Sequence, residues 1–200
     1  MAKQHMTEIA PGIKAFQWTC LDLDDPKSLD WDRAIQILRR RFEDRYITPV
    51  DLLIKAERKK PPTQRHFGFT ILAIDCLLVE TLQAFRDGKT DTRHDSKKMF
   101  LTFLTSRPEF MSHFTKLTAE RFYCDFRCGI LHQAEIRGKS RVWSVGKLTA
   151  IIQNSFTVNR TKFHAALIIE FSQYLNELRD SANTTLRENF RKKMDFICTL

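Results

Sequence analysis

The chain has 200 residues and a net charge of +9, and 42% of its residues are hydrophobic. This length suits one domain with an accessory segment, and the apolar share is enough to build a core. Only six Gly and six Pro argue against a turn-rich β protein, while sixteen Phe favour helices packed through aromatic rings. The positive charge indicates a polyanionic partner, either nucleic acid or an anionic membrane surface, although many basic proteins have no such partner.

The cysteines and the apolar runs bear on the compartment in which the protein works. Five Cys is an odd number, and residues 1–12 hold no long apolar run of the kind found in a secretory leader. No window reaches the ~18 apolar residues of a membrane span. The best candidate, Phe67–Val79, is short and contains Asp75. We therefore expect a soluble, reduced, cytoplasmic protein without a membrane partner.

Residues 1–62 are predicted to form an N-terminal extension, partly irregular and partly helical. Residues 1–28 look irregular, with a short strand or strap around Trp18. An amphipathic helix begins after Ser28 or Asp30, either of which is a suitable N-cap.

A second helix of this extension is predicted to begin at Pro49, with Thr48 as its cap. It ends before Pro61-Pro62, because the residue before a proline avoids the helical conformation.

A helical domain is predicted for residues 63–180. Its central helix, residues 63–86, is apolar nearly all round and ends at Asp87-Gly88, a typical C-terminal cap. Another helix begins at Ser96, and shorter stretches follow until a long amphipathic helix covers residues 160–179.

Two smaller elements complete the prediction. Residues 136–145 alternate around a glycine and indicate a small β-hairpin, and residues 184–198, within a C-terminal segment 181–200, form a last helix. The sequence thus predicts an all-α fold, a helical bundle with one small hairpin.

The most informative segment is FYCDFRCGILHQAE, residues 122–135, which places Arg127 and His132 five positions apart. Arg holds a phosphate through its planar fork of donors, and His moves a proton near neutral pH. In an ideal helix these positions lie ~140° apart and do not share a face. Because Gly129 weakens the helix between them, we expect a distortion, a helix end near His132, an Arg127 that reaches around, or a cleft completed by a second copy.

The pattern R-x4-H from Arg127 to His132 resembles the motif of the HEPN superfamily. Residues 122–138, Trp143 and the upstream segment IDCLLVETLQAFRDG are similar to bacterial and plasmid-encoded HEPN-domain proteins. The resemblance covers about residues 67–178 and implies a four- or five-helix bundle that dimerises. It also implies a metal-independent ribonuclease of phage defence or of a toxin–antitoxin system. Cys128 departs from the family, which often has Asn, Asp or His there.

The expected chemistry uses no metal and no other cofactor. His132 takes the proton of a ribose 2′-hydroxyl, or protonates the leaving 5′-oxygen, while Arg127 holds the scissile phosphate. The products are a 2′,3′-cyclic phosphate (or 3′-phosphate) and a 5′-hydroxyl. Two alternatives stand beside this hypothesis. One is a catalytically inactive HEPN module that binds RNA, nucleotide or a partner protein, and the other is a helical interaction protein with no nucleic-acid role.

A plain structural interpretation of the same two residues also exists. In it His132 is a core histidine, and Arg127 pairs with a nearby carboxylate: Asp125, Glu120 or Glu135.

Three side chains are candidates to support the site. Glu80 lies in an apolar helix, needs a partner there, and is predicted to orient Arg127 or His132. Tyr123 precedes Arg127 by one helical turn and is suited to donate a hydrogen bond to phosphate or to stack on a base. Gln133 is a candidate only because it follows His132 in the sequence. Contacts to the RNA backbone are expected from three basic residues after the motif: Arg137, Lys139 and Arg141.

Cys124, Cys128 and His132 stand on one helical stripe, which invites a zinc interpretation. Four ligands are usual, however, and no CxxC or HxxxH supplies the rest, so packing of small thiols is favoured and no metal is predicted. The predicted partners are RNA, a second copy of the chain, and an antitoxin or another defence-system protein.

Overall fold

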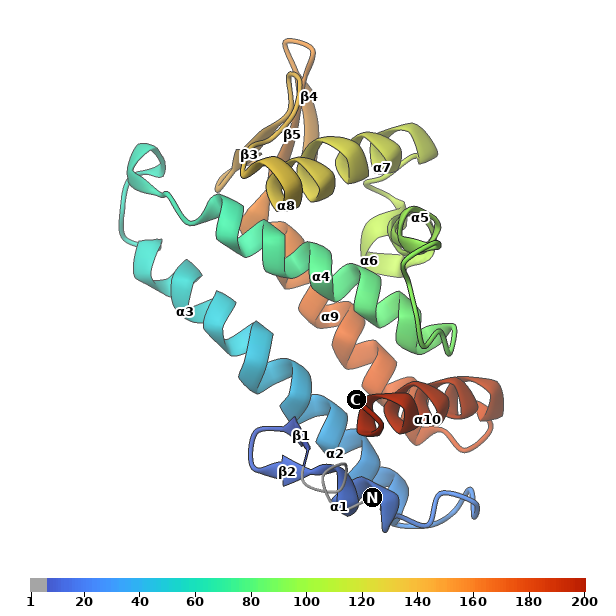
Figure 1. The fold of residues 1–200 in the computed structure, drawn as a ribbon. Helices are drawn as coiled ribbons and strands as arrows, with labels where there is room; N and C mark the ends of the chain where they lie inside the picture. Colours follow the sequence, from blue (N-terminus) through green and yellow to red (C-terminus); the bar gives the residue numbers. More distant parts are fainter. Residues whose placement is uncertain (1–6) are drawn as a thin grey trace. The chain divides into compact units, whose positions relative to one another are not determined.

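The structure, a computed structural model, describes residues 7–200, and the chain divides into two compact units (Figure 1). One unit holds the described residues up to Pro49 together with Ala84–Thr92 and Phe171–Leu200. The other holds Val50–Gln83 and Arg93–Glu170. All candidate residues for catalysis and RNA binding fall in this second unit.

Most described residues are helical. In chain order the helical segments, with η for π or 3-10 turns, are α1 (Ala15–Thr19), α2 (Asp30–Phe42), η2 (Glu43–Ile47), α3 (Thr48–Glu57), η3 (Pro62–Gln64), α4 (Gly68–Arg86), α5 (Ser96–Ser106), α6 (Pro108–Met111), α7 (Lys116–Phe122), η4 (Tyr123–Cys128), α8 (Gly129–Gln133), α9 (Arg160–Arg179) and α10 (Thr184–Cys198). The strands are β1 (Glu8–Ala10), β2 (Ile13–Lys14), β3 (Arg141–Trp143), β4 (Thr149–Ile152) and β5 (Ser155–Asn159). The starts of α5, α9 and α10 agree with the sequence prediction.

The prediction of an all-α fold is wrong, because the strands form two small sheets. β1 pairs with β2, and β5 lies between β3, which is parallel to it, and β4, which is antiparallel. The hairpin predicted at residues 136–145 is also wrong, since its only strand is β3 and that strand pairs with β5. The true hairpin joins β4 to β5 through Gln153 and Asn154, whose φ angles of 48° and 62° suit the tight turns of twisted hairpins.

The first long helix does not break where the sequence suggests. α2, η2 and α3 form one helical run, so no new helix starts at Pro49 with Thr48 as its cap. Proline lacks an N–H, and its ring clashes with the carbonyl four residues earlier in an α-helix. The π turn η2 precedes the proline, and the Thr48 N–H bonds five residues back to Glu43 instead. In the same region Trp18 belongs to the short helix α1 rather than to a strand. Residues 1–6 of the segment predicted to be irregular lie outside the described residues.

Helix α4 starts at Gly68, five residues later than predicted, and Glu57 fixes this start. The Glu57 carboxylate accepts backbone N–H bonds from His66 and from Phe67, the latter at 3.2 Å, and pairs with Arg160 Nη2 at 2.5 Å. Burial alone raises the pKa of Glu57, but the two backbone donors and Arg160 outweigh it and leave the pKa below its usual value. Glu57 is therefore ionised where it caps the helix.

By length and composition, α4 is the one described helix able to cross a membrane, and 61% of its apolar window is buried inside the protein. This differs from the expectation that no segment is long enough. Core helices of soluble proteins meet the same criterion, so the finding is weak evidence for a membrane span.

Aromatic rings hold the second unit together. Phe122, fully buried, stacks on Phe163 with ring centroids 5.0 Å apart and on Phe126 at 4.9 Å, and it also contacts Phe100 and Phe114. These rings come from α5, α7, η4, α9 and the loop before α7, so one side chain joins most layers of the unit.

Replacement of this ring tests its role. Phe122→Ala is expected to lower the free energy of unfolding by about 3–5 kcal/mol, because it leaves a cavity among packed rings. Leu117→Ala, on the same helix but at a side chain 75% exposed, is the matched control and should change it by less than about 0.5 kcal/mol. Urea unfolding followed by circular dichroism measures both. Equal losses in the two variants would contradict the central place of Phe122 in the core.

Candidate active site

A π turn brings Arg127 and His132 together. α7 continues without a break into η4 and α8, and η4 contains Arg127. A π turn is wound more loosely than an α-helix, and this one ends at Cys128, directly after Arg127. Arg127 Nη1 lies 3.4 Å from His132 Nε2. The distortion expected from the sequence is confirmed, and it is a widened helical turn.

The helix ends at Gln133, one residue after His132, and the chain then turns back toward Gly129 and Asp125. Ala134 has a positive φ of 52°, the left-handed conformation typical of helix ends. The returning chain bonds through the Arg137 N–H to the Asp125 carbonyl at 3.1 Å. A Cβ on Gly129 would lie 2.4 Å from the Glu135 carbonyl oxygen, so the return path needs a glycine at this position.

Glu80 holds the guanidinium in place. Arg127 Nη2 lies 3.1 Å from Glu80 Oε2, and the same oxygen accepts a 2.8 Å hydrogen bond from the Ser96 hydroxyl. The Tyr123 hydroxyl lies 3.3 Å from Ser96 Oγ, and the Tyr123 ring faces the guanidinium with its centroid 5.5 Å away. Of the three supporting residues predicted from the sequence, Glu80 and Tyr123 contact Arg127. Ser96 had no sequence signal beyond its position as a helix start.

The cluster has one half-buried cation and one exposed imidazole. The Arg127 side chain is 18% exposed and that of Glu80 is 14% exposed, while His132 lies at the surface. Burial acts to lower the pKa of Arg127, but the charges of Glu80 and Tyr123 outweigh it and raise the pKa above its ordinary value. Arg127 therefore stays cationic.

The plain structural interpretation is right that Arg127 pairs with a carboxylate, but the partner is Glu80 rather than a residue near it in the sequence. Asp125 Oδ2 accepts bonds from Ser140 Oγ at 2.6 Å and from Arg121 Nε at 3.3 Å, and Glu120 pairs with Lys97. Neither carboxylate binds Arg127, and His132 is no core residue.

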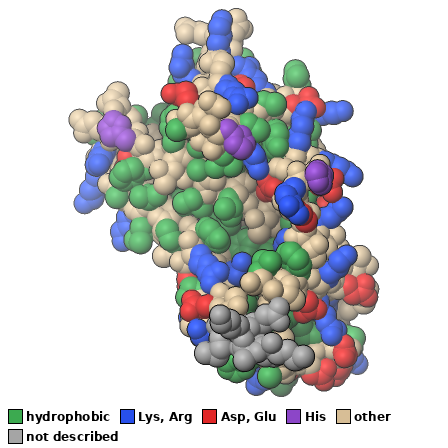
Figure 2. All heavy atoms as spheres, in the orientation of Figure 1, with side chains coloured by type: hydrophobic (Ala, Val, Ile, Leu, Met, Phe, Trp, Pro, Cys, Tyr) green, Lys and Arg blue, Asp and Glu red, His purple; other side chains and the backbone are tan. Residues whose placement is uncertain are grey.

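The remaining predicted residues have no hydrogen bond to Arg127 or His132 among those found for the described residues, and Arg137 is tied near them by its N–H bond to the Asp125 carbonyl. Gln133 is exposed at the last position of α8. Three exposed basic side chains lie on the chain that follows: Arg137, Lys139 and Arg141. Figure 2 shows Lys and Arg side chains at the top of the view, over the strands β3, β4 and β5 of Figure 1. The basic surface thus lies beside the end of the helix that carries His132.

A second polar pair, Asp75 and His164, was missed by sequence reasoning. Asp75 Oδ1 lies 2.6 Å from His164 Nδ1, and both side chains are buried. Burial raises the pKa of Asp75, although the hydrogen bond and the charge of His164 oppose the shift. Asp75 in an apolar helix signals the need for a partner, and His164 lies on the apolar side of α9 next to Phe163.

The described residues hold no group of three His, Cys, Asp or Glu side chains placed to bind a metal ion. All five cysteines are free, with Cys124 exposed and Cys128 partly exposed.

Comparison of the chain with protein-family models, with curated proteins and with solved structures finds no match. The resemblance to HEPN proteins therefore rests on the motif and its flanks.

The backbone of the motif can be tested with a matched pair of variants. Gly129→Ala is expected to lower the free energy of unfolding by about 1–3 kcal/mol, because the new methyl group meets a carbonyl oxygen. Ala134→Gly should leave it unchanged or raise it slightly, because glycine adopts a positive φ without strain. Thermal unfolding of the purified variants measures both changes. A Gly129→Ala protein as stable as the wild type would rule out the close return of the chain.

Proposed function

We propose that the protein is a metal-independent RNA endonuclease of HEPN type. The observation that carries the proposal is the 3.4 Å approach of Arg127 Nη1 to His132 Nε2 at a surface next to exposed basic residues. A permanent cation and a titratable imidazole at this distance suit the binding and cleavage of a phosphodiester. The family resemblance of the motif adds a role as a defence or toxin effector in the cytoplasm.

The proposed reaction is an internal transesterification of RNA. His132 Nε2 takes the proton of the ribose 2′-hydroxyl, and the 2′-oxygen forms a bond to the neighbouring phosphorus. The bond from phosphorus to the 5′-oxygen breaks, and this oxygen takes a proton from water or from a second imidazole. The products are a 2′,3′-cyclic phosphate and a 5′-hydroxyl.

Arg127 stabilises the charge that develops in this step. Glu80 engages Nη2 and fixes the plane of the guanidinium, so the remaining N–H donors on the His132 side can bind a phosphate oxygen without reorientation. Tyr123 packs on the guanidinium and limits its motion further. The exposed side chains of Arg137, Lys139 and Arg141 are proposed to bind the RNA backbone on either side of the cleaved bond.

Cleavage of labelled RNA in excess EDTA tests the proposal. The wild type should cleave, and Arg127→Ala and His132→Ala should each cleave on the order of 10²–10⁴-fold more slowly, because each lacks a group that acts in the transition state. Controls are His113→Ala and Arg33→Ala, which change an exposed histidine and an exposed arginine elsewhere and should retain full activity.

Other outcomes separate the rival functions. Cleavage that requires Mg²⁺ would overturn the proposed chemistry. Salt-dependent RNA binding without cleavage would point to the catalytically inactive HEPN module, and the absence of any RNA binding would leave a helical interaction protein.

A second copy of the chain is proposed to complete the site. The reaction needs a base and an acid, and one His132 supplies only one of them. Leu131, next to His132, is 47% exposed, and Leu77, one turn before Glu80, is 42% exposed, so apolar surface borders the site. Two copies related by a two-fold axis would cover this surface and bring both imidazoles to one phosphate.

Sedimentation equilibrium at micromolar concentration tests the dimer. The wild type should sediment at twice the chain mass of 23.6 kDa. Leu131→Asp is expected to shift the protein to the monomer, because it puts a charge into the apolar contact. Leu117→Asp, at a more exposed leucine outside this surface, should remain dimeric. A wild type that is monomeric throughout would exclude the shared site.

A further inference from the structure

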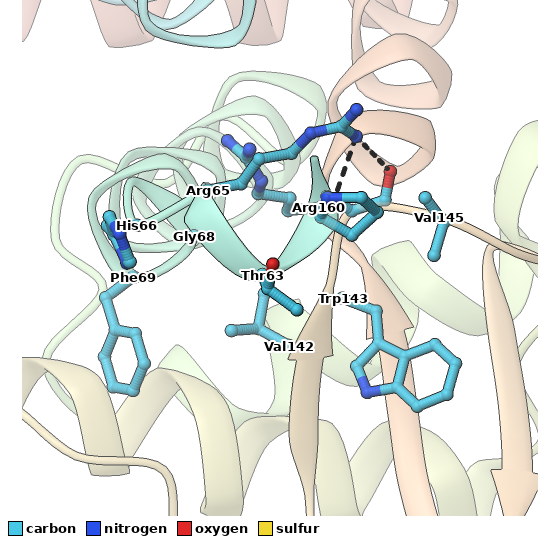
Figure 3. A pocket seen from close by; sticks show the side chains of 11 residues that line it. Thr63, Arg65, His66, Gly68, Phe69, Val142, Trp143, Val145 and Arg160 are labelled. Atoms are coloured by element: carbon cyan, nitrogen blue, oxygen red, sulfur yellow. Dashed lines mark hydrogen bonds between the residues drawn. The ribbon is translucent and has the colours of Figure 1, made fainter. Parts of the chain in front are cut away.

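A pocket of about 480 Å³ opens between the residues before α4 and the strand β3. Figure 3 shows the Phe69 ring and the Trp143 indole on either side of Val142, with the Arg65 guanidinium bonded to Ser144 above them. Its volume lies within the range of small-molecule sites. A neighbouring groove of about 520 Å³ shares Arg65, Ser144 and Arg160 with it, so two arginines line both hollows.

Arg160 is a buried cation with an unused donor. Its side chain is 3% exposed, and Nη2 pairs with Glu57 at 2.5 Å. Nη1 is buried, and no hydrogen-bond acceptor lies within reach of it among the described residues. A buried N–H without a partner costs free energy, and the Arg160 residue lines both the pocket and the neighbouring groove.

Arg65 adds a second positive charge at the same place. Nε donates to the Lys60 carbonyl at 2.9 Å, and Nη1 lies within hydrogen-bond distance of Ser144 Oγ at 3.3 Å. These partners of Arg65 are neutral oxygens, and none of the described ion pairs neutralises its charge. The exposed loop Arg58–Lys60 carries three more cations beside it.

Trp143 supplies an aromatic face. It is 38% exposed, whereas the other two indoles, Trp18 and Trp31, are 2% and 6% exposed. An exposed indole at the mouth of a pocket with two arginines is the combination that holds an unpaired base and its phosphate, since bases stack on aromatic rings and arginine binds phosphate.

We propose that this pocket binds a single unpaired nucleotide, with its phosphate at the end lined by Arg65 and Arg160 and its base on Trp143. The nucleotide is either free in solution or part of a single-stranded RNA. Gly68, in the pocket, and Glu80, at the Arg127 site, are twelve residues apart on α4, a separation of roughly 18 Å along the helix. The pocket is therefore a second site, and binding there does not depend on RNA cleavage at His132.

The intrinsic fluorescence of the full chain tests the proposal. Adenosine and uridine monophosphates and short single-stranded RNAs are titrated against the His132→Ala protein, which keeps the RNA intact. Quenching of Trp143 by the monophosphates identifies a site for free nucleotides, and quenching by the oligonucleotides alone identifies a site for a segment of RNA. Trp143→Phe should abolish the quenching, because the two buried indoles are shielded.

Calorimetry with the better ligand measures the contacts one by one. Trp143→Ala and Arg65→Ala are each expected to weaken binding on the order of 10-fold to 100-fold. The double variant Glu57→Gln with Arg160→Met removes the buried charges together, which avoids an unpaired carboxylate, and should weaken binding by a similar factor. Ile151→Ala and Lys162→Ala, at an exposed apolar and an exposed basic residue outside the pocket, are the controls and should bind like the parent protein.

The results that overturn the proposal are equally definite. Any one of three results would overturn it. The first is that neither monophosphates nor oligonucleotides quench the fluorescence. The others are that quenching persists in Trp143→Phe, or that Arg65→Ala binds within two-fold of the parent. Thermal unfolding establishes that each variant is folded before it is titrated. If the double variant is unstable, the affinity of Arg65→Ala alone tests whether the pocket binds the phosphate. If Arg127→Ala loses RNA cleavage but still binds the nucleotide, then nucleotide binding in the pocket is independent of cleavage at the Arg127 site.

Discussion

Buried or partly buried carboxylates along α4 and at its start determine what packs against this helix in the second unit. Glu57 caps the helix and pairs with Arg160, Asp75 pairs with His164, and Glu80 pairs with Arg127. An ionised carboxylate without a partner is strongly destabilising inside a protein. Two of these partners lie on α9 and one on η4, so electrostatics fixes how α9 and η4 align with α4 while the aromatic rings fill the space between them.

The third of these pairs links packing to chemistry. Because Glu80 is held by Ser96 and packs within the unit, Arg127 has a fixed position before any ligand arrives. The π turn then sets His132 relative to Arg127, and Gly129 lets the chain return closely enough to end the helix there. A site built in this way needs little reorganisation when it binds a phosphate, which is the condition under which fixed donors stabilise a transition state best.

Sequence reasoning predicted local features well and long-range pairings poorly. The starts of α5, α9 and α10 follow from caps and apolar periodicity, and the contact of Glu80 with Arg127 follows from the need of a carboxylate in an apolar helix. The sheet of β3, β4 and β5 was missed, because its parallel pair joins residues far apart and its turn, Gln153-Asn154, lacks the glycine that usually marks one. The partnership of Asp75 with His164 was missed for the same reason, since nothing local connects them.

The Glu57–Arg160 pair belongs both to the start of α4 and to the surroundings of the pocket proposed to bind a nucleotide. Glu57 has four acceptor sites and meets the two N–H groups before α4 as well as Arg160 Nη2, so the carboxylate is well satisfied. The guanidinium is not, because Nη1 has no acceptor among the described residues. A phosphate bound beside Arg160 and Arg65 would bring acceptor oxygens to this part of the molecule, which an apolar ligand would not. An anion that carries a base is therefore the ligand that we propose for this pocket, because arginine binds phosphate and bases stack on an exposed indole such as Trp143.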